Sequence, residues 1–298
     1  MRNAVAFLDH AVTSILAQSF ADFEFMIVDD GSTDGSLDRA RGFTDPRIRI
    51  HAQPATGIVS ALNAGIALAQ GPLIARMDAD DVALPDRLQK QVSLLRERPD
   101  IAAVGSGYTV IDRDGRQLRE IMLPTDPDEI RQTLRVTNCM AHPTMVIRRD
   151  AIVRAGGYRD KFPFCEDYDL WLRLSEASPL TNIPEALLLY REHDANATWA
   201  NLEQRIRSEV ALLHCAVLRR SQQDERDGPV RPGEALGMDA AAHRREMRGR
   251  ALRAAGGAVG EHRPLVARAA LRVALRQGYM PLLDIARLLR LALFAYTM

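Results

Sequence analysis

The sequence predicts an α/β protein with a doubly wound sheet, followed by a helical extension. Within the first hundred residues, three short apolar runs alternate with amphipathic helical patterns, which is the order expected for a sheet covered by helices. Two of these runs end in acidic turns, Asp29-Asp30-Gly31-Ser32 and Asp78-Ala79-Asp80-Asp81. Open α/β sheets bind ligands at such strand ends. With 298 residues, the chain has room for one large α/β domain and an appended part.

The first elements follow from the spacing of apolar residues. Residues 4–18 carry apolar side chains three and four positions apart, which predicts an amphipathic helix. Residues 25–28 are wholly apolar, as is typical of a strand buried on both faces. The next elements expected in order are a strand over 47–51, a helix over 57–70, a strand over 73–77 and a helix over 85–98.

Beyond residue 100 the order changes to a mixed α+β pattern. Asp112-Arg113-Asp114-Gly115 is typical of a hairpin turn, and a helix with an apolar stripe follows Glu166 and Asp167. A mixed region of this kind is a usual place for a second substrate. The expected strands are 101–104, 108–111, 116–122, 144–147 and 186–190, and the expected helices are 126–135, 150–155 and one starting at 166.

The C-terminal third is helical and rich in arginine. Residues 1–201 hold 22 basic and 29 acidic residues, a net charge of −7, whereas residues 202–298 hold 17 and 10, a net charge of +7. Basic amphipathic helices can lie on an anionic membrane surface, but packing on the main domain or a solvated basic face explains them equally. Helices are expected over 202–223, 238–255, 264–276 and 281–296, with a linker over 224–237.

Cysteine usage and hydropathy exclude several classes. Cys139, Cys165 and Cys215 lack Cys-x-x-Cys spacing and are odd in number, so neither a disulfide framework nor a zinc site is predicted. We find no signal-peptide pattern and no apolar stretch of the ~18 residues that a membrane span needs. A reducing, cytoplasmic setting is expected, with no nucleic-acid partner.

The acidic turn at Asp78, Asp80 and Asp81 is the main candidate for chemistry. Three carboxylates at the end of a buried strand repel one another unless a cation or hydrogen-bond donors compensate them, and a divalent metal is the simplest such cation. A solvated turn in which Asp81 caps a helix would use the same residues. These residues alone leave both interpretations open.

The other polar candidates are also ambiguous by themselves. Glu166 and Asp167 precede a helix, where acids are favoured by the helix dipole without any further function. His193 follows a predicted strand, and a single histidine in that position is more often a surface residue than a ligand. Only the combination of motifs separates these alternatives.

Five motifs occur in an order that resembles family 2 glycosyltransferases of the GT-A fold, over about residues 3–200. The resemblance implies a GT-A domain over 1–200, with a nucleotide-sugar half over 1–100 and an acceptor half over 101–200. A basic helical extension then occupies 201–298. The motifs are Asp29-Asp30-Gly31-Ser32-Thr33-Asp34, Asp78-Ala79-Asp80-Asp81 with Pro85-Asp86-Arg87-Leu88, Gly156-Gly157-Tyr158, Glu166-Asp167-Tyr168-Asp169-Leu170-Trp171, and Tyr190-Arg191-Glu192-His193.

The resemblance implies a donor site in the first half. Asp30 would bind the nucleotide base, usually uracil, with Asp29 and Ser32 in the same turn. Asp80 and Asp78 would bind Mn²⁺ or Mg²⁺, and Asp78 would also contribute to nucleotide binding. Both ions prefer oxygen ligands and bind few carboxylates together with substrate phosphates.

The resemblance also implies roles in the second half. His193 would be a further metal ligand, and an imidazole suits Mn²⁺ better than Mg²⁺. Asp167 would be the catalytic base of an inverting transfer, because a carboxylate must remove the proton of the attacking acceptor hydroxyl. Asp81, Gly157 and Glu166 would contact the donor or the acceptor.

The function implied is transfer of a sugar from a nucleoside-diphosphate sugar, with UDP as the expected nucleotide, to a saccharide or lipid-linked acceptor. Envelope polysaccharide or glycolipid synthesis at the inner face of the cytoplasmic membrane would suit the basic tail. The alternative is a catalytically inactive nucleotide-binding or scaffold protein of the same fold. A nucleotidyltransferase is disfavoured, because a Gly-rich basic phosphate loop is absent near the start.

One departure from the family pattern concerns the N-terminus. Family members begin with an apolar strand that ends in a turn similar to Pro-x-Arg/Tyr-Asn, and here Arg2-Asn3 resembles the end of that turn. The first strand of the sheet is therefore missing from this sequence. We expect a strand of ~5–6 residues ahead of Met1, which would make Met1 an internal start.

Overall fold

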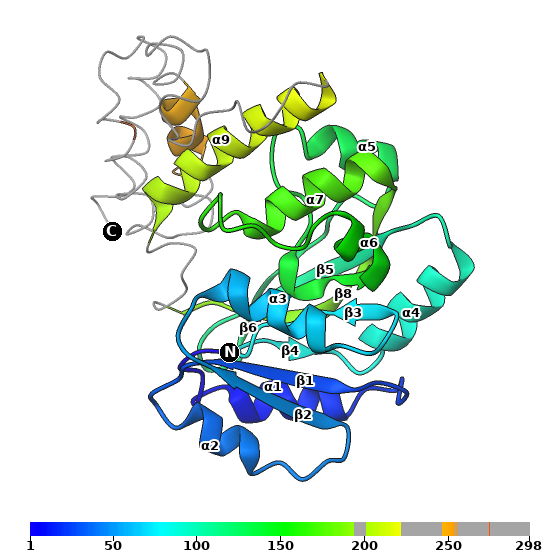
Figure 1. Ribbon diagram of the computed structural model, residues 1–298, viewed down its shortest axis with the longest axis vertical. Helices are drawn as coiled ribbons and strands as arrows, with labels where there is room; N and C mark the ends of the chain where they lie inside the picture. Colours follow the sequence, from blue (N-terminus) through cyan, green and yellow to red (C-terminus); the bar gives the residue numbers. More distant parts are fainter. Residues whose placement is uncertain (194–200, 222–245, 254, 256–273, 275–298) are drawn as a thin grey trace. The chain divides into compact units, whose positions relative to one another are not determined.

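The computed structural model describes residues 1–193, 201–221, 246–253, 255 and 274. The chain divides into two compact units, Met1–Asp160 with Glu166–Asp194 and Lys161–Cys165 with Ala195–Met298. All strands of the described residues belong to the first unit (Figure 1). Because the candidate residues also lie there, the first unit is described in more detail.

Two parallel strands form a small sheet in the first unit. β1 (Phe25–Asp30) pairs with β2 (Ile48–Gln53), so that Asp30 lies opposite Gln53. α2 (Ser36–Arg41) and α3 (Ile58–Leu68) lie on opposite sides of this sheet in Figure 1. Because side chains alternate along a strand, Ile27 packs among apolar residues that include Leu8 and Ala40, whereas Val28 faces Gly65 of α3.

The first helix positions the segment that follows the acidic turn. α1 (Leu8–Leu16) buries the stripe that its spacing predicted. Gln18, just after α1, donates from Nε2 to the Leu84 carbonyl at 2.7 Å, and its Oε1 accepts the Leu88 N–H at 2.9 Å. The Ala83 N–H donates to Ser14 Oγ at 3.1 Å. These bonds fix the chain between the acidic turn and the next helix.

A six-stranded mixed sheet forms the centre of the first unit. Only β5 and β8 are parallel, and the other pairs are antiparallel. β5 is buried along nearly its whole length, next to a core that contains Leu88, Ile101, Val104 and Val146. The strands in sheet order are β3 (Leu73–Ala75), β7 (Val146–Arg148), β5 (Ala103–Ile111), β8 (Leu180–Arg191) and β4 (Val82–Ala83), with β6 (Gln117–Ile121) paired to β5.

Local sequence signals explain the helices of the first unit. Asp126 caps α5, because its side chain accepts the N–H groups of Asp128 and Glu129, and Pro127 begins the helix. Gly156 and Gly157 end α6 with φ values of 82° and 71°, which favour glycine. The helices are α4 (Arg87–Glu97), α5 (Pro127–Thr133), α6 (Arg149–Arg154) and α7 (Glu166–Ala177), with a 3₁₀ turn at His142–Thr144.

The second unit is helical in its described residues. α9 (Leu202–Arg220) ends close to the predicted boundary, and residues 246–253 and 255 are helical within the predicted helix 238–255. Arg250 Nη1 pairs with Glu209 Oε2 at 3.1 Å. The predicted linker over 224–237 and the helices over 264–276 and 281–296 lie outside the described residues, apart from Ala274. No helix in the described ranges is long and apolar enough to cross a membrane.

Two strand predictions were wrong in their extent. In place of the predicted strands 101–104 and 108–111, residues 103–111 form one strand, β5, because Gly105 and Gly107 provide room for close neighbours and form no turn. A Cβ atom on Gly105 would lie 2.2 Å from Asn182 Oδ1. β8 begins at Leu180, well before residue 186, and its register against β5 shifts between Ser106 and Gly107.

The sheet of the first unit is divided into two separate parts. The α/β class is confirmed, but β1 and β2 form a sheet of their own, and a short strand, β4, separates the acidic turn from α4. On the edge of β1 away from β2, Met1 donates its amino group to the Val28 carbonyl at 2.5 Å and accepts the Asp30 N–H at 2.9 Å. Among the described residues, no strand joins β1 to β3. The strand expected ahead of Met1 stays a prediction.

Candidate functional site

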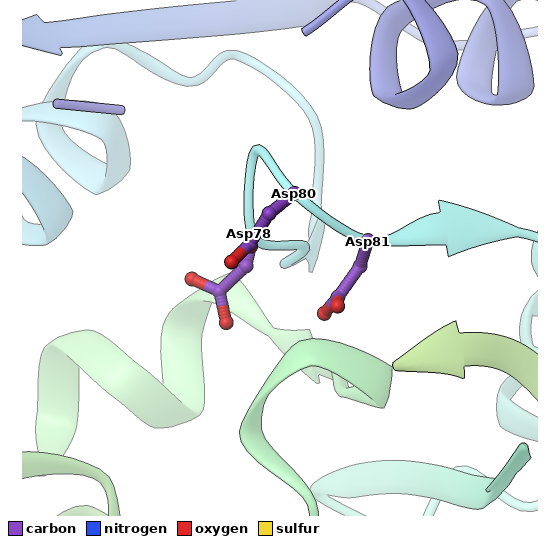
Figure 2. Close-up of side chains that lie close together, drawn as sticks. All are labelled: Asp78, Asp80 and Asp81. Carbon is purple, nitrogen blue, oxygen red and sulfur yellow. The ribbon is translucent and has the colours of Figure 1, made fainter. Parts of the chain in front are cut away.

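The acidic turn lies between β3 and β4. One side-chain oxygen from each of Asp78, Asp80 and Asp81 lies within 4.8 Å of the others. Figure 2 shows the three side chains extending toward the same side of the turn. Asp78 and Asp80 are partly exposed, whereas Asp81 is only 1% exposed. The structure thus brings together the three carboxylates that the sequence singled out.

The described protein groups engage the three carboxylates of the turn unequally. Arg76 donates to both carboxylate oxygens of Asp78. Asp81 Oδ1 accepts the Arg191 N–H at 2.9 Å, but its buried Oδ2 has no hydrogen-bond partner in the described part of the chain. Burial and the Asp78 charge raise the pKa of Asp80, and burial with both neighbouring acids raises the pKa of Asp81 well above its usual value. Grouped oxygen ligands with an unpaired buried oxygen fit a divalent cation such as Mn²⁺ or Mg²⁺.

The end of β8 and the start of α1 support this turn. His193 Nε2 lies 3.0 Å from Asp80 Oδ2, so the structure places the third predicted ligand beside the carboxylates. The His193 ring stacks on the Phe7 ring with 5.1 Å between centroids. The Arg191 guanidinium lies 4.9 Å from the centroid of the Phe7 ring. Arg191 Nε donates to the Asp80 carbonyl at 2.8 Å. Phe7 was not identified from the sequence, where it is one apolar residue among several.

The predicted base-binding residue is already engaged by the end of β2 and the loop between β2 and α3. Asp30 accepts hydrogen bonds from Gln53 Nε2, the Thr56 N–H and the Gly57 N–H, each at 2.9 Å. Burial alone would raise the pKa of Asp30, but these donors outweigh it and lower the pKa. Asp29 Oδ1 is buried and has no partner among the described residues. The two neighbouring acids are therefore in different electrostatic situations.

Ser32 belongs to a small network that closes the turn after β1. Its N–H donates to Asp29 Oδ2 at 3.2 Å, and its Oγ accepts the Asn3 N–H at 3.0 Å. Asn3 Oδ1 accepts the Thr33 N–H at 2.9 Å. Asn3 has a φ of 51°, a strained value for a residue other than glycine. The residue that resembled the end of the family's first turn thus fixes the turn that follows β1.

The second acidic group lies at the start of α7. Glu166 is 8% exposed, and burial together with the Asp167 charge raises its pKa to about 7. Burial also raises the pKa of Asp167, opposed by the Tyr168 N–H at 2.7 Å and by Asn138 Nδ2 at 3.0 Å. Burial thus raises the pKa values of both neighbouring acids, which favours proton acceptance by a general base. No spacing or composition signal pointed to Asn138.

Arg76 acts electrostatically on both acidic groups. It pairs with Asp78, and its charge also lowers the pKa values of Glu166 and Asp167. Its side chain is 10% exposed, so water screens this charge weakly. Arg76 is therefore the cation that couples the two acidic groups.

Gly157 packs closely against Asn63 and bonds to Arg173, and it belongs to neither of the two acidic groups. Its carbonyl accepts a hydrogen bond from Arg173 Nη2 at 2.8 Å. A Cβ atom on Gly157 would lie 2.8 Å from Asn63 Oδ1, which also accepts the Tyr158 N–H. This close packing explains why glycine is needed there. The expected contact of Gly157 with donor or acceptor stays a prediction.

A mixed sheet with two acidic groups on one compact unit is the framework of a glycosyltransferase. The model of Glycosyl transferase family 2 matches residues 1–156, and the chain belongs to that family. It is 33% identical over 216 residues to the O-antigen biosynthesis glycosyltransferase WbnJ of Escherichia coli, covering 70% of this chain and 81% of the relative. It is 31% identical over 209 residues to the amylovoran biosynthesis glycosyltransferase AmsE of Erwinia amylovora, covering 69% and 78%. The predicted family is confirmed.

Solved structures share the fold at low sequence identity. The mannosyltransferase PcManGT from Pyrobaculum calidifontis, solved with GDP-Man and Mn²⁺, has a TM-score of 0.58 and 19% identity, covering 99% of this chain and 78% of that chain. S. aureus TarS 1–349, solved with UDP-GlcNAc, has a TM-score of 0.55 and 14% identity, covering 98% and 88%. These similarities support the GT-A-like architecture expected from the sequence.

Proposed function

We propose that this glycosyltransferase is an inverting, metal-dependent enzyme that moves a sugar from a UDP-sugar to an acceptor hydroxyl. The observation that carries the proposal is the grouping of Asp78, Asp80 and Asp81 within 4.8 Å in a member of this family. A second pair of carboxylates with raised pKa values stands at the start of α7. A donor site and a proton acceptor are the two parts that this reaction needs.

The donor site would be built around the acidic turn. Asp80, Asp78 and His193 would bind Mn²⁺ or Mg²⁺, which supplies positive charge for the departing diphosphate. PcManGT, whose fold is similar, was solved with Mn²⁺. Asp81, with its unpaired buried oxygen, would contact the donor sugar or the metal's waters.

The nucleotide would be bound at the strand ends of the first half. Asp29 and Asp30 are the last residues of β1, Ser32 follows that strand, and Asp78 belongs to the acidic turn after β3. Because Asp30 already accepts three hydrogen bonds at 2.9 Å, it would bind the base with its remaining lone pairs or by exchanging its contact with Gln53. UDP is our choice of nucleotide, as in the TarS complex, although PcManGT was solved with GDP-Man.

Asp167 would be the catalytic base. Burial raises its pKa while Asn138 and Tyr168 donate to its two oxygens, which keeps an ionised carboxylate in a fixed orientation. It would accept the proton of the acceptor hydroxyl as the oxygen attacks the anomeric carbon opposite the diphosphate. Glu166 and Gly157 would help to hold the acceptor.

The acceptor would be a saccharide or a lipid-linked saccharide of an envelope polysaccharide or glycolipid. The names of WbnJ and AmsE place those relatives in O-antigen and amylovoran biosynthesis. In this proposal residues 1–200 carry the transfer, and the basic segment 201–298 brings the enzyme to an anionic membrane surface. The cytoplasmic location stays a prediction.

The proposal is tested by hydrolysis of nucleotide sugars in the presence of Mn²⁺. The donors are UDP-glucose, UDP-galactose, UDP-N-acetylglucosamine and GDP-mannose. Asp80→Ala and Asp167→Asn should each lower kcat by at least about 100-fold. The matched control is Asp38→Asn, whose side chain is 86% exposed, and it should keep wild-type activity. Equal rates in all variants would refute these roles, and complete inactivity of the wild type with every donor would favour a scaffold protein.

A further inference from the structure

Asn138 makes a directed contact with the carboxylate that the proposed function assigns as base. Its Nδ2 donates to Asp167 Oδ2 at 3.0 Å, across 29 positions of sequence. The other oxygen, Asp167 Oδ1, accepts the N–H of Tyr168 at 2.7 Å. One donor on each oxygen fixes the plane of the carboxylate and leaves a lone pair on each oxygen available to accept a proton.

The orientation of the Asn138 amide is itself fixed. Asn138 Oδ1 accepts the Met140 N–H at 3.1 Å, so the NH₂ group, and not the oxygen, is turned toward Asp167. The segment before it is bonded to α7, because Tyr168 Oη donates to the Leu134 carbonyl at 2.7 Å. The loop and α7 are therefore joined by two side-chain hydrogen bonds, one from Asn138 to Asp167 and one from Tyr168 to the Leu134 carbonyl.

The hydrogen bond from Asn138 distinguishes Asp167 from the neighbouring acid Glu166. Burial raises the pKa of both acids, the Asp167 charge raises the pKa of Glu166 further, and the other charged or titratable groups near them are Arg76, Asp78 and Tyr158. Arg76 acts on both acids, whereas Asn138 donates to Asp167. The hydrogen bond favours the ionised form of that one acid.

We propose that Asn138 is a positioning residue for the transfer reaction, which orients the Asp167 carboxylate and makes Asp167, rather than Glu166, the ionised acid of the pair. The inference rests on the proposed base role of Asp167. It assigns a task to a residue outside every motif by which the family was recognised.

The test compares Asn138→Ala, Asn138→Asp and Asn138→Gln with Val136→Ala, an exposed side chain in the same loop. The assay is Mn²⁺-dependent hydrolysis of whichever of UDP-glucose, UDP-galactose, UDP-N-acetylglucosamine or GDP-mannose the full-length wild type turns over. The parameters kcat and KM are measured from pH 5 to 9. Asp167→Asn is measured alongside.

Asn138→Ala should lower kcat by about 10- to 100-fold with the donor KM within about twofold, since only a bond to the base is lost. The acidic limb of its pH profile should move to higher pH. Asn138→Asp, which is isosteric and can keep the bond to the Met140 N–H, should move it further because a second charge faces Asp167. Asn138→Gln should recover part of the rate, and Val136→Ala should match the wild type.

A second measurement does not depend on turnover. In protein labelled with ¹³C at aspartate carboxyls, the Asp167 signal is assigned by its loss in Asp167→Asn, and its titration is followed in each folded variant. The pKa of Asp167 should rise in Asn138→Ala and in Asn138→Asp. The inference would be overturned if the titration of Asp167 were the same in all variants. It would also be overturned if Asn138→Asp kept the wild-type kcat and the wild-type acidic limb of the pH profile. Wild-type activity of Asp167→Asn would instead overturn the base role itself.

Discussion

His193 Nε2 lies 3.0 Å from Asp80 Oδ2, which joins the end of β8 to the acidic turn across 113 positions of sequence. The stacked Phe7 ring limits the ways in which the imidazole can turn. A carboxylate and an imidazole held this close can bind one cation without a large rearrangement. The three acids of the turn would then share that cation's charge.

Replacement of His193 by alanine should weaken Mn²⁺ binding more than Mg²⁺ binding. The expected loss of Mn²⁺ affinity is about 10- to 100-fold, because an imidazole suits Mn²⁺ better than Mg²⁺. The measurement is calorimetric titration of each metal into the protein with saturating UDP. His10→Ala is the matched control, since His10 is exposed on α1. Equal affinities for wild type and His193→Ala would remove His193 from the metal site.

Arg191→Lys should destabilise the protein although charge is conserved. The guanidinium donates to the carbonyls of Asp80 at 2.8 Å and Arg113 at 2.9 Å, and the residue is only 4% exposed. A lysine carries all its donors on one nitrogen and cannot reproduce the separate positions of Nε and Nη1, so the free energy of unfolding should fall by about 1.5–3 kcal/mol. Urea unfolding at constant pH measures this change.

Arg39→Lys provides the comparison for Arg191→Lys. Arg39 pairs with Asp9 where both side chains are about half exposed, so its replacement should change the free energy of unfolding much less than Arg191→Lys does. Similar losses in the two variants would show that Arg191 does not support the turn in the way described.

Asp30→Asn should affect stability as well as nucleotide binding. The carboxylate accepts the Thr56 and Gly57 N–H groups, and an amide can accept only one of them without turning its NH₂ toward the other. The free energy of unfolding without nucleotide should fall by about 1.5–3 kcal/mol. Thermal unfolding with and without UDP separates this loss from the loss of binding. A variant as stable as the wild type would contradict the loop-fixing role of Asp30.

The metal-free protein should become less stable as pH rises from about 5 to 7.5. Glu166 has a pKa of about 7 in the folded protein against an ordinary value of 4.5, so the folded state keeps a proton that the unfolded state releases. Its contribution is fully present below pH 4.5 and is lost as pH rises through 7. Glu166→Gln should remove on the order of 1–3 kcal/mol of this pH dependence. Denaturant titrations in EDTA at several pH values measure it, and parallel curves for the two proteins would contradict the prediction.

Much of the fold was predictable because its signals are local. The 3.6-residue spacing of apolar side chains located α1, α3 and α4, and Asp126 with Pro127 marked the start of α5. The division of β5 into two predicted strands falls at Gly105-Ser106-Gly107. At Gly105 the missing side chain makes room for Asn182, a neighbour on another strand that no local pattern can identify.

The sequence by itself determined the family and the identity of the acidic candidates, because closely spaced aspartates at a strand end are a local chemical pattern. Only the tertiary structure decided what each acid contacts. It directs Asn138 to Asp167, Arg191 to Asp81 and His193 to Asp80, and it leaves one oxygen of Asp81 buried without a partner in the described chain. Such contacts join residues that are far apart in sequence. Hydrogen bonds and pKa values depend on distance and burial, which exist only once the chain has folded.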